Sequence, residues 1–183
     1  ILGDRAQTLD SQMQDVLTFL PKIFGRTIRK IIMNKSYRNT MEIARYAEKL
    51  TGVKDVELLK RHGKEVVEEQ FQTEDAVLDE ILSKAKLGED EYETAAIITM
   101  TEAEAFTLYQ MLKARGEEVH YIDRNSSVFK KGLTVTTFYL AKGLEFDQVF
   151  GVFQDAGNPM LNQAKYICAT RALHELYMYQ ITE

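Results

Sequence analysis

The chain has 183 residues, of which 45% are hydrophobic and 28% charged, and its formal net charge is −5. This length can form one domain with a substantial core, and the ordinary composition excludes a fibrous or disordered chain. A single cysteine, Cys168, excludes an internal disulfide framework and is typical of a reducing compartment. The acidic balance argues against a domain that grips nucleic acid alone, because phosphate contacts usually need an excess of Lys and Arg.

The ends and the hydropathy of the chain bear on its location. No apolar run approaches the roughly 20 residues of a membrane-spanning helix. The opening Ile-Leu-Gly-Asp lacks the basic segment of a signal peptide. We therefore expect a cytoplasmic protein with no membrane partner. The chain begins without methionine, in residues typical of the end of a buried strand, so we also expect a fragment of a larger protein.

Apolar periodicity alternates along the chain between short β-rich runs and longer helical stretches. The pattern predicts helices over Ser11–Leu20, Thr40–Leu50, Glu74–Lys86, Glu102–Arg115 and Asn162–His174. It predicts strands over Ile28–Met33, Glu65–Phe71, Ala95–Met100, Glu118–Ile122, Thr134–Phe138, Gln148–Phe153 and Leu176–Ile181. Strands that alternate with helices across short connections predict an α/β fold, with a mostly parallel sheet flanked by helices on both faces.

Local signals support several of these elements. Pro21 is expected to end the first helix, because proline cannot donate the hydrogen bond of a helix interior. Thr101 and Glu104 have the spacing of a capping box ahead of the fourth helix, and Gly116 stands where that helix should end. The run 95–100 is almost continuously apolar, which predicts a strand buried on both faces.

A polar loop, Ala141–Asp147, follows the predicted strand Thr134–Phe138. In α/β sheets ligands bind beyond the carboxyl ends of strands, so this loop is well placed for chemistry. Gly143 would allow the backbone to approach a ligand closely, and Glu145 could accept hydrogen bonds from a ribose hydroxyl. The alternative is an ordinary strand-to-turn connection in which Lys142 and Glu145 are simply solvated.

The segment Tyr166–Ala172 places Arg171 on a predicted helix that is otherwise lined by Ile167, Cys168 and Ala172. An arginine held rigidly by a packed helix can neutralise negative charge that develops on a phosphoryl group. The alternative is a single arginine that extends from a helix into solvent.

A third polar segment, Met33–Thr40, follows a predicted strand and precedes an amphipathic helix. Tyr37 beside Arg38 could stack on a base while the arginine contacts phosphate. The alternative is a polar loop in which Asn39 or Thr40 caps the next helix.

Together with Gly3–Gln7, these segments resemble, in order and spacing, the C-terminal half of superfamily 1 DNA helicases of the UvrD/Rep type. Gly3–Gln7 looks like motif III, Ser36–Thr40 like motif IV, Thr137–Phe146 like motif V and Tyr166–Ala172 like motif VI. The resemblance covers residues 1–183 as one domain. It implies the second RecA-like lobe, called 2A, of a bacterial P-loop NTPase-type motor.

The resemblance also implies roles for individual residues in ATP chemistry. The side chains that would contact the γ-phosphate, and so act in catalysis, are Gln7, Arg38 and Arg171. The residues that would bind the rest of ATP are Tyr37 at the adenine, Gly143 at the phosphates and Glu145 at the ribose. At the positions that would bind single-stranded or partly duplex DNA stand Thr137 and Tyr139.

Three features of the family are missing from this sequence. No Gly-x-x-x-x-Gly-Lys-Ser/Thr occurs, and no acidic pair at a strand end remains for Mg²⁺, so the resemblance implies that a missing N-terminal RecA-like lobe holds ATP and Mg²⁺. We predict that the chain alone hydrolyses no ATP. The large 2B insertion of many relatives is also absent, and the histidines show no metal-ligand spacing.

The departures from the family affect its nucleic-acid contacts. The stretch Thr8–Met13 lacks the aromatic residue that relatives stack on a DNA base, a contact worth roughly 1–3 kcal/mol, and Tyr139 replaces the usual histidine. This pattern is similar to helicase IV and to Gram-positive relatives that act on RNA polymerase. Three hypotheses follow, of which the first is a nucleoid-associated DNA helicase or translocase and the second is an ATP-driven factor that displaces RNA polymerase or another protein from nucleic acid. An inert domain that kept only the fold is the third.

Overall fold

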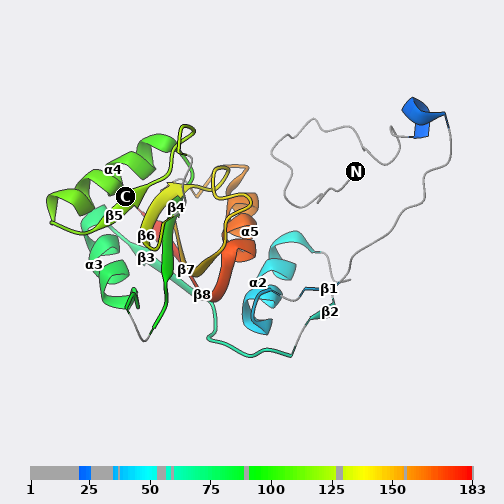
Figure 1. The fold of residues 1–183 in the computed structure, drawn as a ribbon, viewed down its shortest axis with the longest axis horizontal. Helices are drawn as coiled ribbons and strands as arrows, with labels where there is room; N and C mark the ends of the chain where they lie inside the picture. Colours follow the sequence, from blue (N-terminus) through cyan, green and yellow to red (C-terminus); the bar gives the residue numbers. More distant parts are fainter. Residues whose placement is uncertain are drawn as a thin grey trace.

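The computed structural model describes residues 21–25, 35–36, 38–52, 57–58, 60–88, 91–126, 130–154 and 156–182 (Figure 1). The predicted helix Ser11–Leu20, the predicted strand Ile28–Met33, and the candidate residues Gln7 and Tyr37 lie outside these ranges.

A parallel sheet of six strands, in the order β3-β8-β7-β4-β6-β5, forms the centre of the described part of the chain. The strands are β3 (Val67–Phe71), β4 (Thr94–Thr99), β5 (Val119–Tyr121), β6 (Gly132–Thr137), β7 (Phe146–Phe153) and β8 (Ala172–Ile181). All residues of β4 are buried, as its continuous apolar pattern predicts for a strand between β6 and β7. A separate parallel pair joins β1 (Lys35–Ser36) to β2 (Glu57–Leu58).

Helices cover both faces of the sheet, which confirms the predicted α/β fold (Figure 1). One face packs against α2 (Met41–Thr51) and α5 (Leu161–Arg171), and the other packs against α3 (Glu74–Lys84) and α4 (Glu102–Ala114). The capping box of Thr101 and Glu104 is present at α4, and Gly116 follows that helix with a φ of 84°. Thr40, rather than Asn39, caps α2 through the backbone N–H of Ile43.

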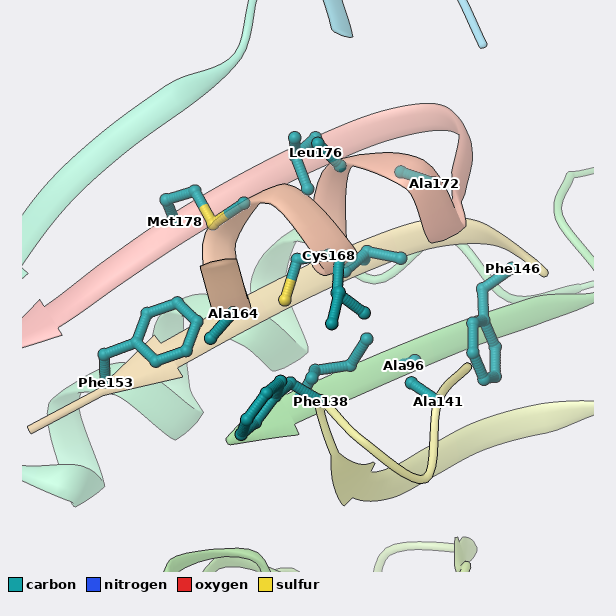
Figure 2. Packing of buried hydrophobic residues seen from close by; sticks show 14 of the residues in the cluster. Ala96, Phe138, Ala141, Phe146, Phe153, Ala164, Cys168, Ala172, Leu176 and Met178 are labelled. Atoms are coloured by element: carbon teal, nitrogen blue, oxygen red, sulfur yellow. The ribbon is translucent and has the colours of Figure 1, made fainter. Parts of the chain in front are cut away.

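The core on the α5 side holds the elements of the candidate site in place. Cys168 and Ala164 of α5 lie against the rings of Phe138 and Phe153 and the side chain of Met178 (Figure 2). The small residues of α5 bring the helix backbone close to the sheet, so the end of α5 has a well-defined position relative to β7 and β8.

Some predicted boundaries are wrong. The helix α5 ends at Arg171 and β8 begins at Ala172, because residues 172–175 pair in parallel with residues 146–148 of β7. Residues 21–24 are helical, and the helix Ser11–Leu20 that Pro21 is expected to end lies outside the described residues. Within the described residues, no helix has the length and apolarity that crossing a membrane requires.

Candidate functional site

The loop between β6 and β7 runs from the carboxyl ends of the strands back to their amino ends. We call these two ends of the sheet the carboxyl edge and the amino edge. Both strands run parallel to β4, so the chain that leaves the carboxyl end of β6 must return to the amino end of β7. Phe138 still lies at the carboxyl edge, where its N–H donates to Thr99 O at 3.0 Å. Ala141 is buried against the sheet, Gly143 turns the chain with a φ of 89°, and Glu145 directly precedes β7.

This crossing corrects the expectation that the loop lies beyond the carboxyl ends of the strands. Thr137 is the last residue of β6 and Tyr139 follows shortly after it at the carboxyl edge, but Glu145 is at the amino edge, directly before β7. The predicted site residues are therefore divided between the two edges of one sheet. The reason is that a connection between two parallel strands has to return along the whole length of the strands.

At the amino edge the structure brings Arg38 and Glu145 together. The Nε of Arg38 lies 2.7 Å from Oε1 of Glu145, and the two side chains are 47% and 40% exposed. A guanidinium and a carboxylate are suitable ligands for phosphate oxygens and ribose hydroxyls respectively. Both groups therefore face solvent at the same point of the surface.

Arg171 is the last residue of α5, as expected, but its guanidinium is buried and 4% of the residue is exposed. Its Nη1 donates to Leu144 O at 3.2 Å, and Nε and Nη2 donate to Thr170 Oγ1 at 3.3 Å. Arg171 thus contacts the carbonyl of the residue that precedes Glu145. The second predicted arginine therefore contacts the loop that carries the predicted ribose ligand.

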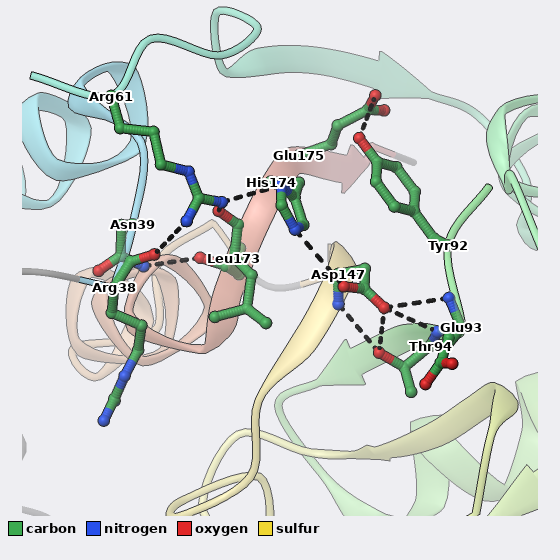
Figure 3. A network of polar contacts seen from close by, with 11 residues as sticks. Arg38, Asn39, Arg61, Tyr92, Glu93, Thr94, Asp147, Leu173, His174 and Glu175 are labelled. Carbon is green, nitrogen blue, oxygen red and sulfur yellow. Dashed lines mark hydrogen bonds and ion pairs between the residues drawn. The ribbon is translucent and has the colours of Figure 1, made fainter. Parts of the chain in front are cut away.

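Two further residues connect these segments; sequence reasoning considered Asn39 only as a helix cap and missed Arg61. The Nδ2 of Asn39 donates to Ala169 O at 3.0 Å and to Ala172 O at 2.6 Å. The Nη2 of Arg61 donates to Leu173 O at 3.0 Å (Figure 3). No local pattern could have identified them, since their partners lie more than 100 residues away along the chain.

Polar contacts continue from this corner along the amino edge to β4. Arg61 Nη2 lies 2.9 Å from Nδ1 of His174, and Nε2 of His174 lies 3.6 Å from Oδ1 of Asp147 (Figure 3). The other oxygen of Asp147 accepts from Thr94 N and Thr94 Oγ1 at 3.0 and 2.8 Å and from Glu93 N at 3.1 Å. These contacts join the first residues of β8, β7 and β4.

Glu175 of β8 is a buried carboxylate, 3% exposed, with several donors around it. Burial raises the pKa of this carboxyl, but hydrogen bonds from Lys64, Tyr177, Lys86 and Gln148 outweigh burial and lower the pKa to about 2. The lysine ammonium groups lie 2.8 and 3.0 Å from Oε1. Because its oxygens are bound by these groups, Glu175 acts as a structural anion of the sheet edge.

The two candidate nucleic-acid residues lie at the carboxyl edge. Thr137 is 1% exposed, and its hydroxyl is buried. The hydroxyl of Tyr139 donates to Glu102 Oε1 at 2.8 Å, and Arg124 Nε donates to the same oxygen at 2.9 Å. The Arg124 guanidinium also lies 6.0 Å from the centre of the Tyr139 ring.

The donor set at the amino edge fits phosphate better than it fits a metal ion. Arg38 and Arg171 are cationic, and one oxygen of Asp147 accepts from Glu93 and Thr94 while the other lies 3.6 Å from Nε2 of His174. In the part of the chain that the structure describes, no group of three or more His, Cys, Asp or Glu residues could hold a metal ion.

No protein-family model and no curated protein matches the chain. The chain is similar to the crystal structure of the C-terminal domain of a possible DNA helicase from Lactobacillus plantarum WCFS1, with 28% sequence identity and a TM-score of 0.57. The match covers 80% of this chain and 88% of that domain. The fold is therefore helicase-like: a RecA-like α/β domain of the kind found at the C-terminus of that protein.

Two more distant matches are to Arterivirus nonstructural protein 10, a helicase. Without DNA it is 14% identical with a TM-score of 0.42, over 63% of this chain and 27% of that one. In complex with DNA it is 15% identical with a TM-score of 0.42, over 64% and 28%. This chain thus spans about a quarter of the viral protein, and a likeness of this degree adds nothing to the argument on function.

Proposed function

We propose that this chain is the second motor lobe of an ATP-dependent superfamily 1 DNA helicase or translocase of the UvrD/Rep type, in a branch similar to helicase IV. The observation that carries the proposal is the meeting of Arg38, Glu145 and Arg171 at one corner of the sheet, from segments that are far apart in the sequence. The similarity to the C-terminal domain of a possible DNA helicase supports it.

In this proposal a first RecA-like lobe holds ATP and Mg²⁺, because the sequence has no P-loop. Transfer of the γ-phosphoryl group to water spreads negative charge over the phosphoryl oxygens. Arg38 and Arg171 neutralise that charge when the lobes close, and Gln7 assists them. Arg38 exchanges Glu145 for phosphate, and Arg171 exchanges Leu144 O for phosphate.

The remaining candidate residues orient the nucleotide and the strand. Glu145 accepts from the ribose hydroxyls once Arg38 has left it, Tyr37 stacks on adenine, and Gly143 allows the loop backbone to approach the phosphates. Tyr139 and Thr137 belong to the track for single-stranded DNA at the opposite edge. Closure on ATP at one edge and opening after hydrolysis would move that track along the strand.

Arg171→Ala in the full-length protein tests the proposal. We expect ATP turnover to fall by roughly 10³-fold or more while nucleotide binding is largely kept, as for the loss of an arginine finger. Arg171→Lys, which keeps the buried charge, is the control for folding, and Arg115→Ala, away from the proposed site, is the control for general loss of charge. Turnover at the wild-type rate in a folded Arg171→Ala protein would refute the assignment.

A factor that displaces RNA polymerase or another protein from nucleic acid is the second candidate. It is favoured by the burial of Thr137 and by the engagement of Tyr139 with an acidic side chain, Glu102, both of which oppose a tight grip on a single strand. ATP turnover of the full-length protein with and without single-stranded DNA separates the two. Strong stimulation by DNA supports the helicase, and turnover indifferent to DNA supports the displacement factor.

The proposal also assigns no independent activity to residues 1–183. Without a P-loop, the chain lacks the backbone cradle that holds the β- and γ-phosphates, so we expect no ATP turnover from it in isolation. Turnover by this chain that Arg171→Ala abolishes would show that the nucleotide site is complete without another lobe.

A further inference from the structure

The carboxyl terminus of α5 is capped by the side chain of a residue from a distant part of the sequence. The last carbonyls of a helix have no intrahelical donor. Asn39 supplies both hydrogens of its Nδ2 to two such groups, Ala169 O at 3.0 Å and Ala172 O at 2.6 Å. Since both partners are carbonyl oxygens, the nitrogen of the amide has to face them. Asn39 therefore ties its own backbone to the end of the helix that carries Arg171.

Arg61 makes a second connection between the same two segments. Its Nη2 donates to Leu173 O at 3.0 Å, and its Nη1 lies 3.5 Å from Arg38 O. The same Nη2 lies 2.9 Å from Nδ1 of His174. Because arginine can only donate, that nitrogen of His174 must accept, so the ring carries its hydrogen on Nε2, toward Asp147.

These contacts hold the backbone of Arg38 but leave its side chain free to change partner. The Arg38 side chain is half exposed and points away from Arg61 (Figure 3), toward its ion pair with Glu145. The backbone carbonyl of Arg38 and the neighbouring residue Asn39 are both bound to the segment 169–173. The bases of the Arg38 and Arg171 side chains are thereby linked through specific hydrogen bonds.

We infer that Asn39 and Arg61 are positioning residues that set the separation of Arg38 and Arg171, so that both guanidinium groups reach the same phosphoryl group. This inference rests on the proposed function. Charge stabilisation in a transition state depends on groups held within about 0.5 Å of the productive geometry. A misplacement of about 1 Å can cost roughly 100-fold in rate.

A purely structural role for Asn39 predicts a different result from a positioning role. Loss of a helix cap lowers the free energy of unfolding wherever the cap is located. Loss of positioning lowers kcat while the KM for ATP changes little, because ATP binding is supplied mainly by the other lobe. Asn158 provides a control, since its Oδ1 accepts from Met160 N at 2.9 Å just before the first residue of the same helix, far along it from Arg171.

The first experiment compares Asn39→Ala and Asn39→Asp with Asn158→Ala in the full-length protein. We expect both Asn39 variants to lose roughly 10- to 100-fold in kcat, with KM for ATP within about twofold of wild type. Asn39→Asp keeps the size of the side chain but replaces the donor with an acceptor, so it separates the hydrogen bonds from packing. Asn158→Ala should lose some thermal stability and keep its kcat.

The second experiment compares Arg61→Lys with Arg115→Lys. Arg61→Lys keeps the charge but not the two-pronged donor that bridges Arg38 O and Leu173 O, so kcat should fall. Arg115 bridges Asp75 and Asp79 at the end of α4, away from the site, and its lysine variant should keep kcat. Combining Asn39→Ala with Arg38→Ala should cost less than the sum of the two changes.

The outcomes separate this inference from the proposed function. If Arg38→Ala and Arg171→Ala abolish turnover while Asn39→Ala and Arg61→Lys behave like their controls, the positioning role is wrong and the proposed function stands. If Arg38→Ala and Arg171→Ala turn over ATP normally, both fail. If Arg38→Ala and Arg171→Ala abolish turnover and kcat falls at unchanged KM in the Asn39 and Arg61 variants but not in Asn158→Ala and Arg115→Lys, the inference is supported.

Discussion

The guanidinium of Arg38 and the carboxylate of Glu145 form an ion pair of 2.7 Å at the amino edge of the sheet, between a loop before α2 and the loop before β7. Both side chains are close to half exposed, so solvent and salt screen their attraction. The pair joins the two residues to which we assign phosphate and ribose. The ion pair therefore contributes little to the stability of the fold, and we assign it a role in holding the two side chains until each binds the nucleotide.

We predict that Glu145→Gln and Arg38→Gln change the free energy of unfolding by about 1 kcal/mol or less, as for other exposed pairs. The same changes should weaken ATP binding or turnover in the full-length protein. Urea denaturation and a fluorescent-nucleotide titration measure the two effects. Lys131→Gln, which breaks an equally short exposed pair with Glu93, should leave nucleotide binding unchanged. A loss of several kcal/mol on Glu145→Gln would instead make the pair structural.

Glu175 predicts a sensitivity to acid. Its pKa is lowered from 4.5 to about 2 in the folded protein, so the unfolded chain takes up the proton more readily. The stabilisation is fully present above pH 4.5 and is lost as the pH falls from 4.5 through 2. The urea midpoint should therefore drop steeply in this window. Glu42, whose pKa is also lowered to about 2, chiefly by a hydrogen bond from His62, contributes in the same direction.

Glu175→Gln measures how much of this acid sensitivity comes from the buried carboxylate of Glu175. The variant should be less stable than wild type at pH 7, because Lys64 and Lys86 lose their counter-charge, and its midpoint should depend less on pH between 4.5 and 2. Glu118→Gln, at an exposed position, should follow the wild-type curve. An unchanged acid slope in Glu175→Gln would show that another group causes the sensitivity.

Gly151 lies in β7 between β4 and β8, where a side chain has no room. A Cβ at this position would be 2.8 Å from Met178 Sδ and 2.9 Å from Phe153 Cε2. We expect Gly151→Ala to destabilise the domain by about 1–3 kcal/mol in urea denaturation. Gly88→Ala, where no atom lies within 4 Å, should be neutral or slightly stabilising. Equal effects of the two changes would mean that the side chains of Met178 and Phe153 move aside for the new methyl group at little cost in free energy.

Cys168 should be unreactive in the folded protein. The thiol is fully buried on the sheet side of α5, and burial raises its pKa, so little thiolate forms. Labelling with a thiol-specific disulfide reagent should follow the unfolding transition measured by circular dichroism. Fast labelling at full native signal would indicate that α5 separates from the sheet without global unfolding.

Part of the fold could be predicted from sequence because its signals are local. The helix α4 begins where Thr101 and Glu104 satisfy each other's backbone donors three residues apart, and β4 is apolar throughout because both of its faces are buried. Such patterns depend on near neighbours and on burial. They indicated the α/β class, most elements and the motifs that contain Arg38, Glu145 and Arg171.

Other features were decided by contacts between distant segments. The end of α5 was misplaced because pairing with β7, rather than the propensity of residues 172–174, places them in a strand. The position of Glu145 at the amino edge follows from the parallel pairing of β6 and β7 with β4. No local sequence pattern contains that pairing.

The sequence by itself determined which residues have the chemistry for phosphate and ribose, because guanidinium and carboxylate groups in recognisable motifs can be read along the chain. Only the tertiary structure decided that Arg38, Glu145 and Arg171 meet at one edge while Tyr139 lies at the other. The same is true of Asn39 and Arg61, which acquire their partners when α5 packs beside α2. The physical reason is that a hydrogen bond depends on distance in space, and the carbonyls of residues 169–173 are brought within reach of these side chains only by folding.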